Sequence, residues 1–192
     1  MSDKSYFEVL QLFGIADGSL KELGSYDDAN YIVQSGNEKY ILKEYVDNEG
    51  LFDRLQAESR VMLNLYKLNP NHFQRQYKTP DGNFVCRIET KDGSKLYRLL
   101  DYLKGDFIAE VKHTDKLLES FGNFLAKLDI ELANIKEPSI LGRQNRWDLQ
   151  FFLMNENLTS YIKEPSRRKI VEYFFLQEPQ VVFFQSAVLL NP

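Results

Sequence analysis

The chain has 192 residues, of which 43% are hydrophobic and 27% are charged, and its formal net charge is −4. This composition is globular and long enough for one domain or two small lobes, and it excludes a disordered chain. The negative charge, without an extended basic stripe, excludes nucleic acid as the main partner. One cysteine, no apolar leader and no 18-residue apolar run predict a cytoplasmic location and no membrane partner.

Residues 18–103 have the pattern of strands and turns. Gly and Asn in segment 35–38, and the Asp-Gly pair in segment 91–94, are residues that favour tight turns between strands. The expected strands span residues 19–23, 30–34, 39–46, 84–89 and 96–102.

A helix is expected from residue 49 to residue 66. Its apolar side chains recur at spacings of four, seven and three residues, which places them on one buried stripe. The stripe consists of Leu51, Leu55, Met62 and Leu65. The resulting order is three strands, one helix and two strands, which resembles the small lobe of a protein kinase.

Lys43 lies in the middle of an apolar strand, and Glu58 lies on the helix that follows. A lysine on the inward side of a strand is costly unless an anion meets it. In kinase-like folds that anion is a nucleotide phosphate, and a helix glutamate holds the lysine in place. The alternative is a solvated lysine on an edge strand. These two residues alone do not decide between the two interpretations.

Beyond residue 105 the pattern becomes helical. Thr114 is the expected N-cap of a helix whose apolar face predicts packing in a core. Another helix is expected to open at residues 145–150, with Trp147 as a packing anchor, and a further helix at residues 165–177. The apolar face of the first helix comprises Leu117, Leu118, Phe121, Phe124, Leu125, Leu128 and Leu132.

Five segments carry a family resemblance: LGSYDDANY at 23–31, YILK at 40–43, RLLDYLKG at 98–105, FGNFLAKLD at 121–129 and RWDL at 146–149. In this order and spacing they resemble the aminoglycoside phosphotransferase family, which also contains choline kinases, and within it the hydroxylysine-kinase-like branch. The resemblance implies an α+β, protein-kinase-like fold. Residues 1–104 would form an N-lobe with an antiparallel sheet, one main helix and the hinge. Residues 105–192 would form the start of a helical C-lobe that is cut short.

The resemblance implies roles for residues of the N-lobe. Lys43 would contact the α and β phosphates of a nucleotide, with Glu58 as its helix partner. Ser25 would lie over the phosphates, in a turn that has one glycine, Gly24, rather than a glycine-rich motif. The implied cofactor is ATP or GTP with Mg²⁺.

The resemblance also places a hinge at Asp101, Tyr102 and Leu103. Backbone groups there would contact the purine edge of the nucleotide, and Gly105 would let the chain turn into the second lobe. The implied partners are the nucleotide and, in the full-length protein, a small amino-bearing metabolite whose hydroxyl group is phosphorylated.

The chain departs from the family where the chemistry would occur. The family supplies a His-x-Asp-x-x-x-x-Asn loop, whose Asp accepts the substrate proton and whose Asn holds magnesium, and a later Asp in an Asp-Phe-Gly-like motif. Neither motif occurs here: His72 precedes Phe-Gln, and His113 precedes Thr-Asp but has no Asn at the required offset. With two histidines and one cysteine, a metal-ligand cluster is not expected either. We therefore expect no catalytic residue and no metal ligand in this chain.

Three functional hypotheses follow from the sequence. The first is the N-terminal portion of a small-molecule kinase that is inactive as this chain alone. The second is a kinase-like module that binds a nucleotide or a partner without chemistry. The third is the front domain of a protein fused to a class III aminotransferase, for which these residues give no direct evidence.

Overall fold

The computed structural model describes residues 3–25, 28–91, 93–141 and 148–176. The chain divides into two compact units, residues 1–141 and residues 142–192, and each is described separately. This division reflects local compactness and does not test the lobe boundary predicted between residues 104 and 105, which stays a prediction.

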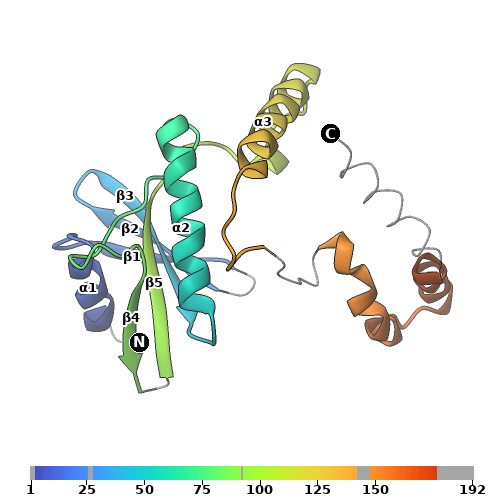
Figure 1. Cartoon of the computed structure of the whole chain (residues 1–192), viewed down its shortest axis with the longest axis horizontal. Coiled ribbons are helices and arrows are strands. Elements are labelled where there is room, and N and C mark those ends of the chain that lie inside the picture. The colour runs from blue at the N-terminus through green and yellow to red at the C-terminus, as the bar shows by residue number, and fades with distance from the viewer. Residues whose placement is uncertain (1–2, 26–27, 92, 142–147, 177–192) are drawn as a thin grey trace. The chain divides into compact units, whose positions relative to one another are not determined.

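The first unit is built on a five-stranded antiparallel sheet with the order β1-β2-β3-β5-β4 (Figure 1). Each of the five expected strands is present, with ends that shift by a few residues. Gly36 has a φ of 55° in the turn between β2 and β3, as the turn pattern predicted. The strands are β1 (Ser19–Leu23), β2 (Ala29–Ser35), β3 (Glu38–Val46), β4 (Cys86–Thr90) and β5 (Gly93–Asp101).

One face of the sheet packs against α1 (Asp3–Leu12), a helix that the sequence analysis missed. Alternate residues of a strand point to opposite faces, so the burial pattern assigns the contacts. Leu42 of β3 and Leu99 of β5 are completely buried beneath Leu10 of α1 and its neighbours. The cluster comprises Val9, Leu10, Phe13, Ile15, Val33, Leu42, Tyr97 and Leu99.

The opposite face packs against α2 (Leu51–Leu68), which corresponds to the helix expected at 49–66. Leu51, Leu55 and Leu65 are buried, as the predicted stripe requires, whereas Met62 is only half-buried. The cluster on this side comprises Tyr45, Leu51, Leu55, Val85 and Leu96. Figure 1 shows α1 and α2 on either side of the strands. The sheet is therefore covered on both faces.

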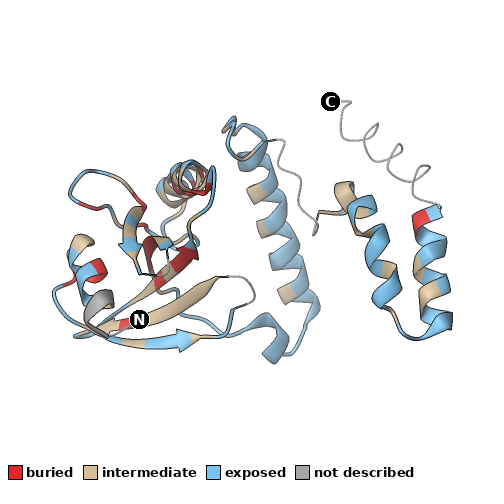
Figure 2. Ribbon diagram, turned by 90° about the horizontal axis from the view of Figure 1, so that it is seen from below, coloured by how far each residue is buried: buried red, intermediate tan, exposed pale blue. Residues whose placement is uncertain are grey.

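Helix α3 (Asp115–Ala133) follows a short 3₁₀ turn, Ile108–Glu110. The Thr114 side chain accepts a hydrogen bond from the Leu117 N–H at 3.2 Å, so the predicted N-cap is confirmed. The predicted core packing of this helix is not observed, because none of its residues is buried (Figure 2). Leu117, Phe124 and Leu128 are half-buried, and the rest of the apolar stripe is exposed. The helix is covered from one side only, by the chain that follows α2.

The second unit contains a 3₁₀ segment (Leu149–Tyr161) and a helix at residues 165–176, which matches the helix expected at 165–177. The Phe152 and Phe175 rings stack with centroids 4.0 Å apart and hold these two segments together. Another helix start was expected at residues 145–150, and its first three residues, Trp147 included, lie outside the described residues. Among the described residues, none of the helices combines the length and apolar character that crossing a bilayer requires.

Candidate functional site

A row of polar side chains crosses the sheet on the face covered by α2. Asn30 of β2 is directly opposite Lys43 of β3, and Lys43 is directly opposite Arg98 of β5. Residues directly opposite each other in an antiparallel pair point to the same face. Lys43 and Tyr45 are two residues apart on β3, so the row shares the face of the α2 cluster. We call Asn30, Lys43 and Arg98 the polar row.

Glu58 reaches the polar row from α2, and its ion-pair partners are arginines. Its Oε2 lies 3.2 Å from Nη1 of Arg98, and its Oε1 lies 3.7 Å from Nε of Arg54, one turn earlier on α2. Among the described residues, Lys43 has no ion pair within 4.0 Å. The structure thus brings Lys43 and Glu58 to one site without a direct contact. The role of Glu58 as the helix partner of Lys43 stays a prediction.

Lys43 is half-buried, and its surroundings destabilise its charged form. Burial lowers its pKa from the ordinary value of 10.5, and the neighbouring positive charge of Arg98 lowers the pKa further. The carboxylates of Asp28 and Glu58 act in the opposite direction without reversing the effect. A half-buried cation in this condition is stabilised by an anion that approaches it.

The loop between β1 and β2 is connected to the polar row through Ser25. Nδ2 of Asn30 donates a hydrogen bond to Oγ of Ser25 at 2.9 Å. Oδ1 of Asn30 is buried and has no hydrogen-bond partner among the described residues, and the same is true of Nε of Arg98. Gly24 is not required by this conformation, because its φ is not positive and a Cβ there would meet no atom within 4 Å.

The predicted hinge begins at the end of β5, where Asp101 is fixed by the preceding chain. Its N–H donates to the Arg75 carbonyl at 3.0 Å, and its carbonyl accepts from Nε2 of Gln74 at 2.8 Å. Its carboxylate accepts from the Tyr77 hydroxyl at 2.7 Å, which with burial raises the pKa of Tyr77. Both backbone polar groups of Asp101 are therefore already engaged.

The next two hinge residues have backbone groups that make no hydrogen bond to another described residue. The Tyr102 N–H donates to the Lys39 carbonyl at 3.3 Å. The Tyr102 carbonyl and both backbone groups of Leu103 make no hydrogen bond to another described residue. Tyr102 and Gly105 line a pocket of about 460 Å³ beside the β2–β3 turn. Gly105 has a φ outside the positive range and open space around it, so this conformation does not require glycine there.

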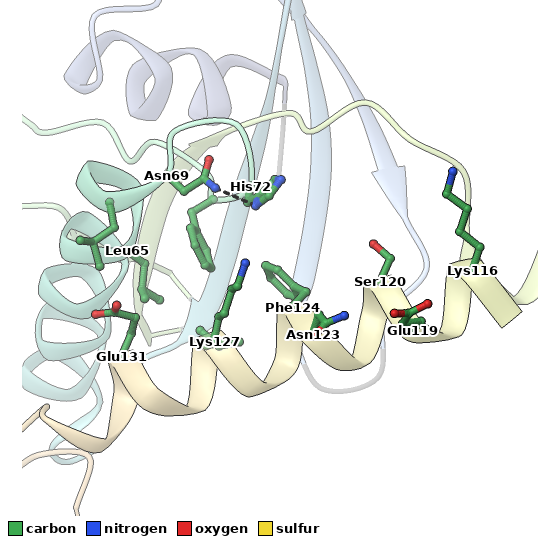
Figure 3. Close-up of a pocket in the computed structure, with 13 residues that line it drawn as sticks. Leu65, Asn69, His72, Lys116, Glu119, Ser120, Asn123, Phe124, Lys127 and Glu131 are labelled. Carbon is green, nitrogen blue, oxygen red and sulfur yellow. Dashed lines mark hydrogen bonds between the residues drawn. The ribbon is translucent and has the colours of Figure 1, made fainter.

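A larger pocket of about 730 Å³ lies between the end of α2 and α3 (Figure 3). Asn69 and His72, from the chain after α2, are joined by a hydrogen bond of 2.9 Å. The rings of His72 and Phe73 pack against Phe124 of α3, with centroids 5.8 and 5.9 Å away. Neither Lys43 nor Glu58 lines this pocket. The pocket lies where α3 contacts the rest of the unit, and it does not include the polar row.

Across the described part of the chain, no group of three or more histidine, cysteine, aspartate or glutamate side chains could hold a metal ion. The ring of His72 contacts α3, and Nε2 of His113 is 2.7 Å from the Ile108 carbonyl, so each histidine has a local structural partner.

The architecture of the first unit can now be compared with known proteins. The profile of the phosphotransferase enzyme family (APH) matches residues 19–174. The chain belongs to the phosphotransferase enzyme family. Its sequence identity to hydroxylysine kinases is modest. It is 28% over 186 residues with the protein of Xenopus laevis, and 30% over 140 residues with that of Danio rerio. These matches cover 88% and 68% of the chain but 49% and 38% of the two kinases.

Solved structures agree on the fold of this phosphotransferase family member. A microcompartment-associated aminopropanol kinase gives a TM-score of 0.60 at 15% identity, covering 85% of this chain and 57% of that one. The amicoumacin kinase hAmiN, in complex with AMP-PNP, Ca²⁺ and Ami, gives 0.63 at 14% identity, covering 88% and 54%. The predicted α+β, kinase-like fold is confirmed. The chain spans about half the length of the relatives that it matches.

Two members of the polar row, Asn30 and Arg98, were missed by the sequence analysis. Lys43 stood out because it interrupts an apolar strand, whereas Arg98 was noted only as part of an expected strand and of a segment with family resemblance. The strand register aligns all three residues, and it is visible only in the structure. No signal in the sequence alone therefore singled out Asn30 and Arg98.

Proposed function

We propose that this chain is the N-terminal portion of an ATP- or GTP-dependent kinase that phosphorylates a hydroxyl group of a small amino-bearing metabolite. The observation that carries the proposal is the polar row facing Glu58, in a member of the phosphotransferase family. Asn30 Oδ1 and Arg98 Nε are buried polar atoms without partners, and Lys43 is a half-buried cation without an ion pair among the described residues. These groups fit a polar, anionic ligand, and a nucleoside triphosphate is such a ligand.

In this proposal, Lys43 neutralises phosphate charge, and the Glu58 carboxylate nearby on α2 favours the charged form of the lysine. Ser25, held by Asn30, lies over the phosphates from the β1–β2 loop. The purine edge forms hydrogen bonds with the Tyr102 carbonyl and the Leu103 N–H. Asp101 is left out of the predicted hinge contacts because its backbone N–H and carbonyl already have hydrogen-bond partners. Magnesium would supply positive charge that neutralises the phosphates, and we propose that its ligands and the proton acceptor belong to a catalytic half beyond these residues.

The substrate class rests on the relatives. The curated relatives act as hydroxylysine kinases, and one structural neighbour is an aminopropanol kinase. Hydroxylysine and aminopropanol each carry an amino group and a hydroxyl group. We therefore propose an amino alcohol or a hydroxy amino acid as the substrate of the full-length protein, and a cytoplasmic setting for the reaction.

The test is to measure phosphoryl transfer from ATP and GTP to a panel of amino alcohols and hydroxy amino acids, including hydroxylysine and aminopropanol. The same assay is run on this chain and on the product of the gene extended downstream. We expect turnover only in the extended protein. Clear magnesium-dependent turnover by the 192-residue chain would contradict the proposal that its catalytic groups lie elsewhere. Failure of an extended protein that contains a His-x-Asp loop to phosphorylate any of these compounds would contradict the substrate class.

A second candidate is a kinase-like module that binds a nucleotide without chemistry. It is favoured by the absence from this sequence of a full His-x-Asp-x-x-x-x-Asn motif and of an Asp-Phe-Gly-like motif. Calorimetric titration with ATP, with and without Mg²⁺, separates the candidates. Tight binding that is independent of magnesium favours the module, and weak binding by this chain favours a portion of an enzyme.

A further inference from the structure

Arg98 is the most highly connected member of the polar row. Its side chain is 8% exposed. Nη1 lies 3.2 Å from Glu58 Oε2, Nη2 donates to the Tyr45 hydroxyl, and the guanidinium carbon lies 5.2 Å from the centre of the Tyr45 ring. One side chain on β5 therefore touches both β3 and α2. These are the two elements that carry the predicted phosphate ligand, Lys43, and its predicted partner, Glu58.

These contacts require an arginine rather than any cation. The planar guanidinium presents separate nitrogens to Glu58 and to the Tyr45 hydroxyl, and it stays protonated in a buried site. A lysine at this position has one ammonium group, which is more costly to bury and lacks the two-pronged geometry. The geometry of the contacts thus depends on the chemistry of the residue and not only on its charge.

Arg98 also changes the surroundings of Lys43. The two residues are directly opposite each other on neighbouring strands, and like charges so placed are unfavourable. Glu58 would relieve Lys43 if it paired with it, but its contacts are with Arg98 and Arg54. Lys43 therefore lies near the carboxylates of Asp28 and Glu58 without an ion pair within 4.0 Å among the described residues.

We infer that Arg98 is a positioning residue of the proposed phosphate site: it fixes Glu58 and Tyr45, and so leaves the Lys43 ammonium to a nucleotide phosphate. This inference rests on the proposed nucleotide-binding function. It assigns a role to a residue that does not itself have to touch the nucleotide, and it accounts for the contact of the helix glutamate with Arg98.

The test compares Arg98→Gln with Arg87→Gln in the purified chain. Arg87 is a matched control, because it lies on the same sheet, forms an ion pair with Asp47 at 2.7 Å and stacks over Phe52 of α2 at 5.0 Å, yet it is not part of the polar row. The probes are ATP and adenosine, which share the base but not the phosphates. Arg98→Gln is expected to weaken ATP binding roughly tenfold or more, because a displaced ligand group loses its alignment with the phosphate. Adenosine binding should be unchanged, and Arg87→Gln should change neither.

A second measurement follows the Lys43 ammonium itself. After reductive methylation with ¹³C-formaldehyde, the Lys43 resonance is assigned with Lys43→Met and titrated by NMR. The charged groups that face Lys43 are Arg98 from β5, Glu58 from α2 and Asp28 from the loop before β2. Removal of Arg98 eliminates a repulsion and frees Glu58, and both changes are expected to raise the Lys43 pKa. A merely structural role for Arg98 would lower overall stability without this specific shift.

The outcomes separate the two proposals. If the unsubstituted chain binds no ATP, the proposed nucleotide binding fails, and the Lys43 titration still decides on Arg98. If ATP binds and Arg98→Gln leaves its affinity unchanged, raises it, or weakens ATP and adenosine equally, the role of Arg98 is wrong. An unchanged Lys43 pKa overturns it as well. Should Arg98→Gln not fold, Arg98→Lys keeps the charge but loses the two-pronged contact, and undiminished ATP affinity in that variant would also overturn the role.

Discussion

Leu42 and Lys43 are neighbours in β3 and point to opposite faces of the sheet. Leu42 is completely buried in the cluster beneath α1, whereas Lys43 is half-buried in the polar row beneath α2. The alternation of a strand therefore separates two requirements within two residues. Leu42 stabilises the fold by apolar burial, whereas Lys43 is a charged group whose burial costs free energy. Substitutions at these two positions should have opposite consequences.

Replacing Lys43 with methionine is expected to preserve the stability of the chain or to raise it by up to about 1 kcal/mol, because an apolar side chain of similar length removes the cost of burying an unpaired ammonium. The free energy of unfolding in urea measures the change. Lys21→Met, at an exposed position of β1, is the control and should have little effect. A loss of more than about 1 kcal/mol in Lys43→Met, on the scale of ordinary point mutations, would mean that the lysine stabilises the fold.

The same lysine predicts a dependence of stability on pH. Its pKa is lower in the folded chain than the ordinary 10.5, so the unfolded chain binds more protons between these two values. Stability contributed by this group therefore rises as the pH rises through the lowered pKa toward 10.5. The groups that set the shift are Arg98, Glu58 and Asp28. The stability advantage of Lys43→Met should shrink as the pH rises.

The parent chain must be compared with Lys43→Met because buried tyrosines change the stability of both in the opposite direction at high pH. Burial raises the pKa of Tyr45 and Tyr97, so the unfolded chain ionises first and stability falls above pH 10. Subtracting the unfolding free energy of the parent chain from that of Lys43→Met cancels this shared effect. A difference that stays constant from pH 7.5 to 10.5 would contradict a lowered Lys43 pKa.

Elements with strong local signals were predictable from the sequence, and the site's partners were not. The strands and α2 followed from alternating or helical apolar patterns and from turn residues such as Gly36. The Thr114 cap was equally local. Arg98 acquires its role only through the β3–β5 register, which depends on contacts between residues more than fifty positions apart. The exposure of α3 also lies beyond local pattern, because periodicity shows that a face is apolar and not what covers it.

Helix α1 had a readable signal that the sequence analysis did not use: Tyr6, Val9, Leu10 and Phe13 recur at helical spacing. Because Leu10 is completely buried, Leu10→Ala is expected to lower the free energy of unfolding by about 2–4 kcal/mol through lost burial and a residual cavity. Gln11→Ala, at the exposed neighbouring position, should change it little. A negligible effect of Leu10→Ala would mean that α1 is not docked on the sheet in solution.

Glu44 offers a test of buried charge on the α1 face, away from the polar row. It is 7% exposed, and its carboxylate accepts hydrogen bonds from Nζ of Lys95 and, at 3.0 Å, from the Tyr97 hydroxyl. Glu44→Ala leaves both donors without this acceptor, and we expect a loss of about 3 kcal/mol in the free energy of unfolding. Glu44→Gln keeps an acceptor for Tyr97 and should cost less.

The two substitutions together identify what stabilises the β3–β5 pairing on this face. Tyr97→Phe provides the third comparison, because it removes one hydrogen bond and leaves the Lys95–Glu44 ion pair in place. Its expected cost is about 1 kcal/mol, the usual net worth of one hydrogen bond. Urea unfolding at neutral pH gives all three values. If Glu44→Ala costs no more than Tyr97→Phe, the ion pair with Lys95 contributes nothing measurable, and the carboxylate serves only as the acceptor for the tyrosine.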